Sequence, residues 1–183
     1  MSQRTEDGAR IRPATQDDLP ELVRLRALLF ENLGGEYFSP TSSSTSTSGG
    51  AAWQDDLAVV LKGQLAVDGN GMRILVVDGD GGGRGDGGGS GDGRLAACAI
   101  GSVEQRLPGP HLLSGRVGLV IGVVTDPAHR RRGHSRALLL GLLDWFRERE
   151  VARVDLYASH EGEPLYRDLG FVNHPDPALY WRP

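Results

Sequence analysis

An apolar run, a basic glycine turn and a helical pattern follow one another directly between Val117 and Glu150. The apolar run over residues 117–124 predicts a buried strand, and apolar residues at helical spacing predict a helix over residues 135–150. The turn between them places several backbone N–H groups and the positive end of a helix dipole at one point. This strand–turn–helix unit therefore predicts an anion site suited to a phosphate or a pyrophosphate.

The remaining segments alternate between strand and helix patterns. Further strands are predicted over residues 10–13, 72–77, 95–103 and 151–158, with another extended segment from Phe171 onwards. Further helices are predicted over residues 17–33, with Thr15 as N-cap, over 163–169 and, on a weaker pattern, over 52–64. This order is typical of a mixed α/β layer with its sheet at the centre.

Two low-complexity segments interrupt the pattern. Residues 41–48 are all serine or threonine and precede two glycines, and residues 79–93 hold glycine at ten of fifteen positions. Neither composition can bury enough apolar surface to offset the entropy of ordering it. We therefore expect mobile loops at 41–50 and 79–93 within a single domain that spans residues 1–183. The second loop would join the strands at 72–77 and 95–103 into a hairpin.

Composition excludes several classes of protein. The net charge of −4 and the pI near 5.7 argue against attraction to nucleic acid or to an anionic membrane surface. The N-terminus lacks the apolar stretch of a signal peptide, and no window approaches the length of a membrane span. The single cysteine, Cys98, excludes an internal disulfide and is expected to be a small buried residue. We expect a cytoplasmic protein.

Three motifs occur along the chain. They are the turn Arg130-Arg131-Arg132-Gly133-His134-Ser135, the segment PLYRDLGF at 164–171, and Ile11-Arg12-Pro13-Ala14-Thr15-x-x-Asp18 near the N-terminus. The first resembles the acyl-CoA motif Arg/Gln-x-x-Gly-x-Gly/Ala of the GNAT superfamily of N-acetyltransferases. The second resembles that family's LYxxLGF segment, and the third resembles its first strand and helix cap.

The resemblance implies a mixed, mostly antiparallel central sheet flanked by helices, with acetyl-CoA as co-substrate and no metal. It implies that the backbone of Val123, Val124 and Thr125 pairs with the pantetheine arm beside a bulge. It also implies that Tyr166 is the acid that protonates the departing thiolate. The residues implied to contact the cofactor in the turn and beyond are Arg130, Arg131, Arg132, Gly133, His134, Ser135, Arg136 and Ser159, of which Ser159 stands where the family often has asparagine.

The leading hypothesis is an acetyl-CoA-dependent N-acetyltransferase that acts on a primary amine of a small molecule or a peptide. The alternatives are a catalytically silent acyl-CoA-binding module and a nucleic-acid-binding protein, which the overall acidity disfavours. Glu31 and Glu36 are candidates for the acceptor site. His134, His160 and His174 are candidate bases, although local structural roles are favoured for all three. Family members are often dimers, which leaves a homodimer as an open alternative.

Overall fold

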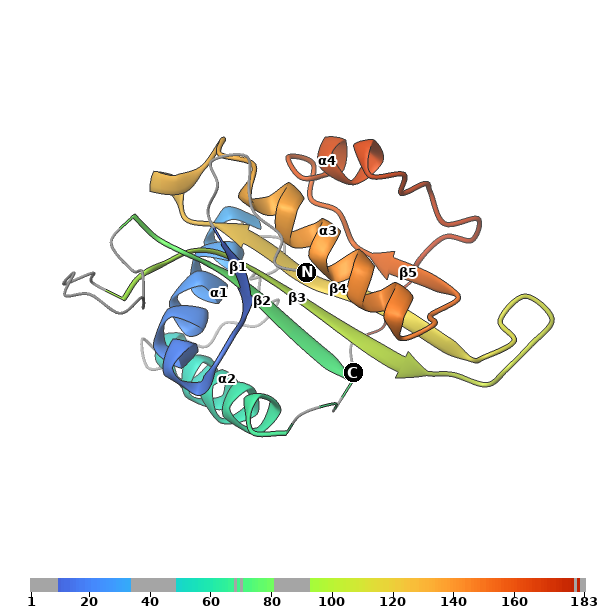
Figure 1. Cartoon of the computed structure of the whole chain (residues 1–183), viewed down its shortest axis with the longest axis horizontal. Coiled ribbons are helices and arrows are strands. Elements are labelled where there is room, and N and C mark those ends of the chain that lie inside the picture. Colours follow the sequence, from blue (N-terminus) through green and yellow to red (C-terminus); the bar gives the residue numbers. More distant parts are fainter. Residues whose placement is uncertain are drawn as a thin grey trace.

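The computed structural model describes residues 10–33, 49–67, 69, 71–80, 93–179 and 181. Within them one sheet has the strand order β1-β2-β3-β4-β5 (Figure 1). The strands are β1 (Ile11–Pro13), β2 (Met72–Asp78), β3 (Leu95–Gln105), β4 (Arg116–Thr125) and β5 (Arg153–Leu156). Neighbours from β1 to β4 are antiparallel, and β5 is parallel to β4. The expected mixed, mostly antiparallel sheet is confirmed.

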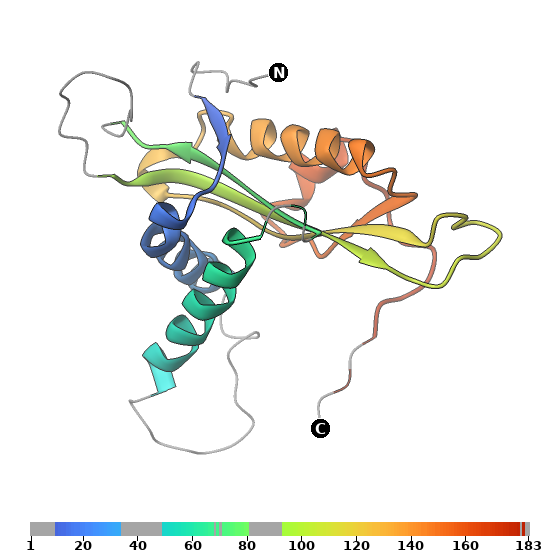
Figure 2. The same cartoon turned by 60° about the horizontal axis from the view of Figure 1, so that its bottom comes forward.

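Helices cover both faces of this sheet. They are α1 (Leu19–Leu33), α2 (Gly49–Leu65), α3 (His134–Glu148) and α4 (Glu163–Asp168), with short 3-10 turns η1 (Gln16–Asp18) and η2 (Pro127–His129). Figure 2 shows α1 and α2 on one face and α3 on the other. None of the described helices combines the length and the apolar character that crossing a membrane requires.

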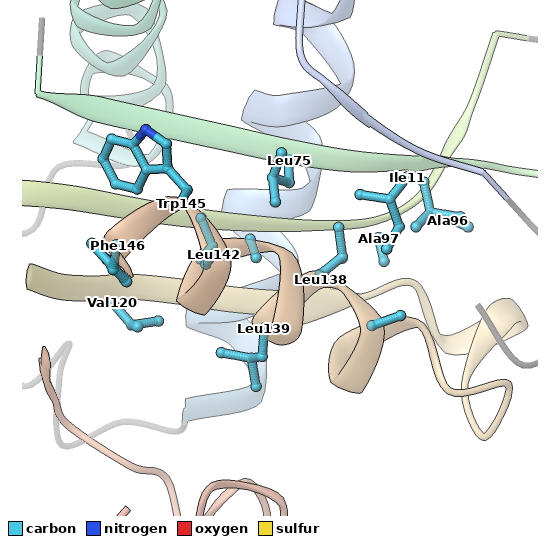
Figure 3. Packing of buried hydrophobic residues seen from close by; sticks show 13 residues of the cluster. Ile11, Leu75, Ala96, Ala97, Val120, Leu138, Leu139, Leu142, Trp145 and Phe146 are labelled. Atoms are coloured by element: carbon cyan, nitrogen blue, oxygen red, sulfur yellow. The ribbon is translucent and has the colours of Figure 1, made fainter. Parts of the chain in front are cut away.

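Each face of the sheet carries its own apolar core. On the α3 face, Leu138, Leu142 and Phe146 pack against strand residues such as Val120 (Figure 3). On the α1 face, Leu22 and Leu25 pack against residues of β2, β3 and β4. Since β3 is covered on both sides, residues 95–101 of that strand are all buried. The helical spacing read from the sequence therefore identifies the faces that are buried.

Arg12 joins β1 to the start of the first helical segment. Its guanidinium donates two hydrogen bonds to Asp18, at 2.7 and 2.8 Å, and pairs with Asp78 of β2 at 2.6 Å. The Thr15 backbone N–H also donates to Asp18, at 2.7 Å. Burial alone would raise the pKa of Asp18, but these hydrogen bonds outweigh it and hold the pKa below its ordinary value of 3.8. Asp18 is therefore an ionised, buried link between β1, η1 and β2.

Replacing Asp18 with asparagine should destabilise the fold by about 1–3 kcal/mol at pH 7, because a buried hydrogen-bond network loses its negative charge and one of its two acceptor oxygens. A folded-state pKa below the ordinary value gives a contribution that is fully present above pH 3.8 and is lost as the pH falls below it. The difference in unfolding free energy between the two proteins should shrink in that range. Urea unfolding at several pH values measures it, with Asp55→Asn on the exposed side of α2 as the control. A difference that does not shrink at any pH below 3.8 would contradict this assignment.

The structure differs from the sequence prediction at two places. The extended segment expected after Phe171 pairs with no strand over residues 171–179, where Pro175 and Pro177 each lack the N–H that a sheet ladder needs. In addition, α2 begins at Gly49, so the last two residues of the loop expected at 41–50 are helical. Residues 41–48 and 81–92 lie outside the described residues. The hairpin on either side of the second tract is present and closes with Gly79 N–H bonded to the Arg94 carbonyl.

Candidate functional site

The end of β4 separates from its neighbour β5. The two strands pair only over residues 117–120 of β4, and a register shift against β3 makes Ile121 an extra residue on β4. A bulge of this kind bends a strand and re-aims the residues that follow. Beyond it, the β5-facing edge of β4 has no strand partner in the described part of the chain. The backbone of Val123, Val124 and Thr125, expected to bind pantetheine, lies in this open stretch.

Asp126 fixes the start of the turn that follows β4. Its backbone N–H donates to the Ala96 carbonyl at 2.8 Å, and its carboxylate accepts from the Ala128 N–H at 3.0 Å. The same carboxylate pairs with Arg24 of α1 at 2.6 Å. Burial would raise the pKa of Asp126, but the Ala128 hydrogen bond and the Arg24 guanidinium outweigh it and lower the pKa. The turn is thereby tied to both β3 and α1.

The turn uses the left-handed backbone region twice, at Arg131 (φ 65°) and at Gly133 (φ 75°). Gly133 directly precedes α3 and lacks the Cβ that makes this conformation costly for other residues. The first N–H groups of a helix have no partner within the helix, and the helix dipole is positive at that end. The turn and the first residues of α3 therefore form the anion-binding arrangement that the sequence predicts.

The basic side chains of the turn differ in their surroundings. Arg130 and Arg131 are exposed and form no ion pair with any residue that the structure describes. Arg132 pairs at 2.5 Å with Asp80, two residues after β2, and that hydrogen bond lowers the pKa of Asp80. Two guanidinium groups are thus accessible to an incoming anion, and a third is shared with a carboxylate.

Ser135 and Thr125 link the two ends of the turn. Their hydroxyl oxygens lie 2.9 Å apart in a hydrogen bond, which joins the last residue of β4 to the first turn of α3. His134, expected to contact the cofactor, has only 4% of its surface exposed. Its side chain is therefore part of the packing beneath the turn, and its contribution to an anion site would come from its backbone N–H.

Tyr166 lies on α4, beside the start of α3. Arg136 of α3 and Asp168 of α4 approach to 3.9 Å, which brings the two helices together. The Tyr166 ring is half-buried against the α3-side core and meets the ring of Phe171 edge-on at 5.9 Å. Burial raises the pKa of Tyr166 above its ordinary value of 10.0. The phenol therefore keeps its proton at neutral pH.

Ser159 caps the start of α4. Its side-chain oxygen accepts from the Gly162 N–H at 3.2 Å, and its carbonyl accepts from the Glu163 N–H at 2.9 Å. A Cβ placed on Gly162 would lie 3.1 Å from the Ser159 hydroxyl oxygen and 3.2 Å from the Tyr166 ring. The hydroxyl acts as an acceptor in this cap, so its proton is left for a second partner. The expected role of Ser159 toward pantetheine remains a prediction.

The other candidates lie apart from the turn. Glu31 is exposed on α1, and Glu36 lies outside the described residues. His160 is exposed beside the α4 cap, and Nδ1 of His174 lies 2.9 Å from the Asp176 carbonyl oxygen. Burial raises the pKa of Cys98 to about 12, so this thiol stays neutral and is no nucleophile. In the described residues, no group of three His, Cys, Asp or Glu side chains is placed to hold a metal.

Two cavities lie along β5 and the segment that follows α4. The smaller has a volume of about 430 Å³ and is lined by Tyr166, Leu156, Phe171 and His174, among others. The larger, of about 740 Å³, follows β5 as far as Arg106. Tyr166 lines the smaller of these two cavities, and the turn before α3 lies outside both of them.

The Arg24–Asp126 pair was missed from the sequence. Asp126 carries a local signal, because aspartate before proline is typical of a helix or turn start. Arg24 carries none, since it stands 102 residues earlier in an ordinary amphipathic helix pattern. Only the folded chain brings the two together.

Comparisons with known proteins agree on one family. Residues 83–171 match the family described as "Acetyltransferase (GNAT) family". A glucosamine 6-phosphate N-acetyltransferase from Trypanosoma brucei brucei is 33% identical over 76 residues, which are 41% of this chain and 52% of that protein. The match thus spans about half the length of this curated relative.

Two solved structures share the fold over nearly their whole length. A GCN5-related N-acetyltransferase from Ralstonia eutropha has a TM-score of 0.71 at 26% identity, and the match covers 95% of this chain and 99% of that one. A predicted acetyltransferase with acetyl-CoA from Clostridium acetobutylicum has a TM-score of 0.70 at 20% identity, with 93% and 94% covered.

Proposed function

We propose that this chain, which belongs to the acetyltransferase (GNAT) family, is an acyltransferase that transfers the acetyl group of acetyl-CoA to a primary amine. The acceptor is a small molecule or a peptide. One observation carries the proposal. The turn in which Gly133 has a φ of 75° leads directly into α3, and it follows the stretch of β4 that no longer pairs with β5.

The residues present fit acetyl-CoA. Its pyrophosphate would meet the backbone N–H groups of residues 131–136, with the exposed Arg130 and Arg131 supplying charge. Its pantetheine arm would follow the open edge of β4 at residues 123–125. The pyrophosphate and the pantetheine arm thus each have a matching group on the protein, and the Thr125–Ser135 hydrogen bond joins the two groups.

When bound, acetyl-CoA supplies an activated acetyl thioester. The role of the protein is to exclude water, to orient the thioester and to hold a proton for the departing sulfur. Tyr166 is suited to the last task, because its burial keeps the phenol protonated and it lies on α4 next to the start of α3.

Release of free thiol from acetyl-CoA over a panel of amines tests the proposal. The panel should contain amino acids, amino sugars, aminoglycosides and peptides, and it should include glucosamine 6-phosphate, because a relative carries that activity in its name. Thiol release that depends on one class of amine, with the acetylated product seen by mass spectrometry, would support the proposal. CoA binding with no transfer to any amine would instead favour a silent acyl-CoA-binding module.

Replacing Asp80 with asparagine should tighten CoA binding by about two- to fivefold at low salt, the scale of an exposed ion pair. The Asp80 carboxylate now pairs with Arg132 and adds a negative charge next to the proposed pyrophosphate site. Calorimetric titration with CoA measures the change, and the gain should fade as salt is added. Asp55→Asn removes the same charge from α2, away from the turn, and serves as the control. Weaker binding by the Asp80 variant would argue against a pyrophosphate at this turn.

A further inference from the structure

Arg26 of α1 is a half-buried guanidinium without a carboxylate partner among the described residues. Its Nη1 donates to the Ile121 carbonyl at 3.3 Å, and the group lies over the Phe30 ring, 4.7 Å from its centroid. Arg24, one half-turn earlier, is paired with both Glu21 and Asp126. Burial lowers the pKa of Arg26, whereas the carboxylate neighbours of Arg24 raise that of Arg24. No carboxylate among the described residues therefore offsets the free-energy cost of burying the Arg26 charge.

The bulge in β4 provides the space that Arg26 occupies. Ile100 pairs with Gly122 and Gly101 with Val120, so Ile121 is the inserted residue. As a result, Ile121 packs in the α1-side core, and Gly122 faces the same side. A Cβ on Gly122 would lie 2.5 Å from Nη1 of Arg26, so any other residue here would push the guanidinium aside. The glycine thus allows the guanidinium to lie against the β4 backbone.

Arg26 and the proposed cofactor turn lie on opposite faces of the sheet. Gly122 directly precedes the open stretch of β4, while α3 and its turn lie on the other face of the sheet (Figure 2). A ligand that approaches from the α1 side would meet Arg26 next to that stretch. Part of the Arg26 side chain is exposed, and a guanidinium has five N–H donors, of which one is used by the Ile121 carbonyl.

We propose that Arg26 binds the carboxylate or phosphate of the acceptor, so that the acceptors of this enzyme are amines that also carry a negative charge. This inference rests on the proposed acetyl transfer and names the substrate class for the same site. The planar guanidinium suits either anion, since both offer two oxygens to a pair of N–H donors. An anionic group would also supply the counter-charge that the described residues do not.

Matched acceptor pairs test the inference. The two members of each pair share the amine and differ in whether they carry the anionic group: glucosamine 6-phosphate against glucosamine, and an amino acid against its amide. The natural chain should acetylate the charged member of one pair with a kcat/KM about 10- to 100-fold higher, as expected for a charged hydrogen bond. The pair that shows the preference identifies the anion as phosphate or carboxylate.

Arg26→Gln should remove this preference by lowering kcat/KM for the charged acceptor only, and Arg26→Lys should retain part of it. Arg73→Gln is the matched control, because Arg73 lies 5.7 Å from the Trp145 ring on the α3 side and should leave the preference intact. Melting temperatures of all variants confirm that they fold. Equal rates for both members of each pair in the natural chain, or an equal loss for both in Arg26→Gln, would overturn the inference and leave Arg26 a structural residue.

Equilibrium binding separates this inference from the proposed function. Calorimetric titration of the same pairs without acetyl-CoA should show tighter binding of one charged member, and Arg26→Gln should abolish the difference. If no amine is acetylated but the charged member still binds through Arg26, the transfer proposal fails and the anion site stands. If transfer occurs and binding shows no preference for charge, the anion site fails alone.

Discussion

Replacing Gly133 with glutamate should weaken CoA binding by about 100-fold or more, because several charge-assisted hydrogen bonds to one pyrophosphate are lost together. The change places a side chain and a negative charge at the residue that opens α3, where the proposed pyrophosphate approaches the backbone. It also forces a residue with a Cβ into a φ of 75°. That strain costs about 1–3 kcal/mol of stability, so the melting temperature should fall modestly while the fold is kept.

Two companion variants separate charge from strain. Gly133→Asn keeps the left-handed conformation at low cost and adds no charge, so its CoA affinity should fall much less than that of Gly133→Glu. Gly69→Glu adds the same charge at another left-handed glycine (φ 81°) with open space around it, at the far end of β2. Its affinity should match that of the natural chain. Calorimetric titration with CoA measures all three, and an affinity within about twofold for Gly133→Glu would remove the pyrophosphate from this turn.

The strand–turn–helix unit was predictable because its signals are local. Leu138, Leu142 and Phe146 recur at the helical period, and all three are fully buried on one face of α3. The uniformly apolar run of β4 also marks a strand that is covered on both faces. The same uniformity hides the bulge. An inserted residue shows in a sequence as a break in the alternation of apolar and polar residues, and a run in which every residue is apolar has no such alternation. The bulge was therefore expected only from the family resemblance, and the register of β4 against β3 places it at Ile121.

The contacts that complete the candidate site were not predictable, because they join residues distant in the chain. Arg26 and Ile121 stand 95 positions apart, and each belongs to a pattern that is ordinary by itself. The strand expected after Phe171 failed for a different reason. The segment was expected to be extended, but Pro175 and Pro177 remove the donors that pairing requires.

Replacing Tyr166 with phenylalanine should lower kcat by about 10²- to 10⁴-fold, the usual contribution of a positioned proton donor. The change keeps the ring, its packing on the α3-side core and its edge contact with Phe171. It deletes only the hydroxyl, which bonds to no residue that the structure describes. Folding stability and acetyl-CoA affinity should therefore stay close to those of the natural chain. A loss confined to kcat would assign the hydroxyl to the reaction.

The pH dependence gives an independent test of the same role. Burial raises the pKa of Tyr166 above 10.0, so the phenol should hold its proton through the neutral and mildly alkaline range. An acid of this kind is lost only when the pH passes its pKa, so turnover should not decline through tyrosine ionisation below about pH 10. Phe171→Leu, which disturbs the ring contact but leaves the hydroxyl, should reduce kcat far less than Tyr166→Phe. Unimpaired turnover in Tyr166→Phe would make this residue a packing tyrosine and would require another donor for the departing thiolate.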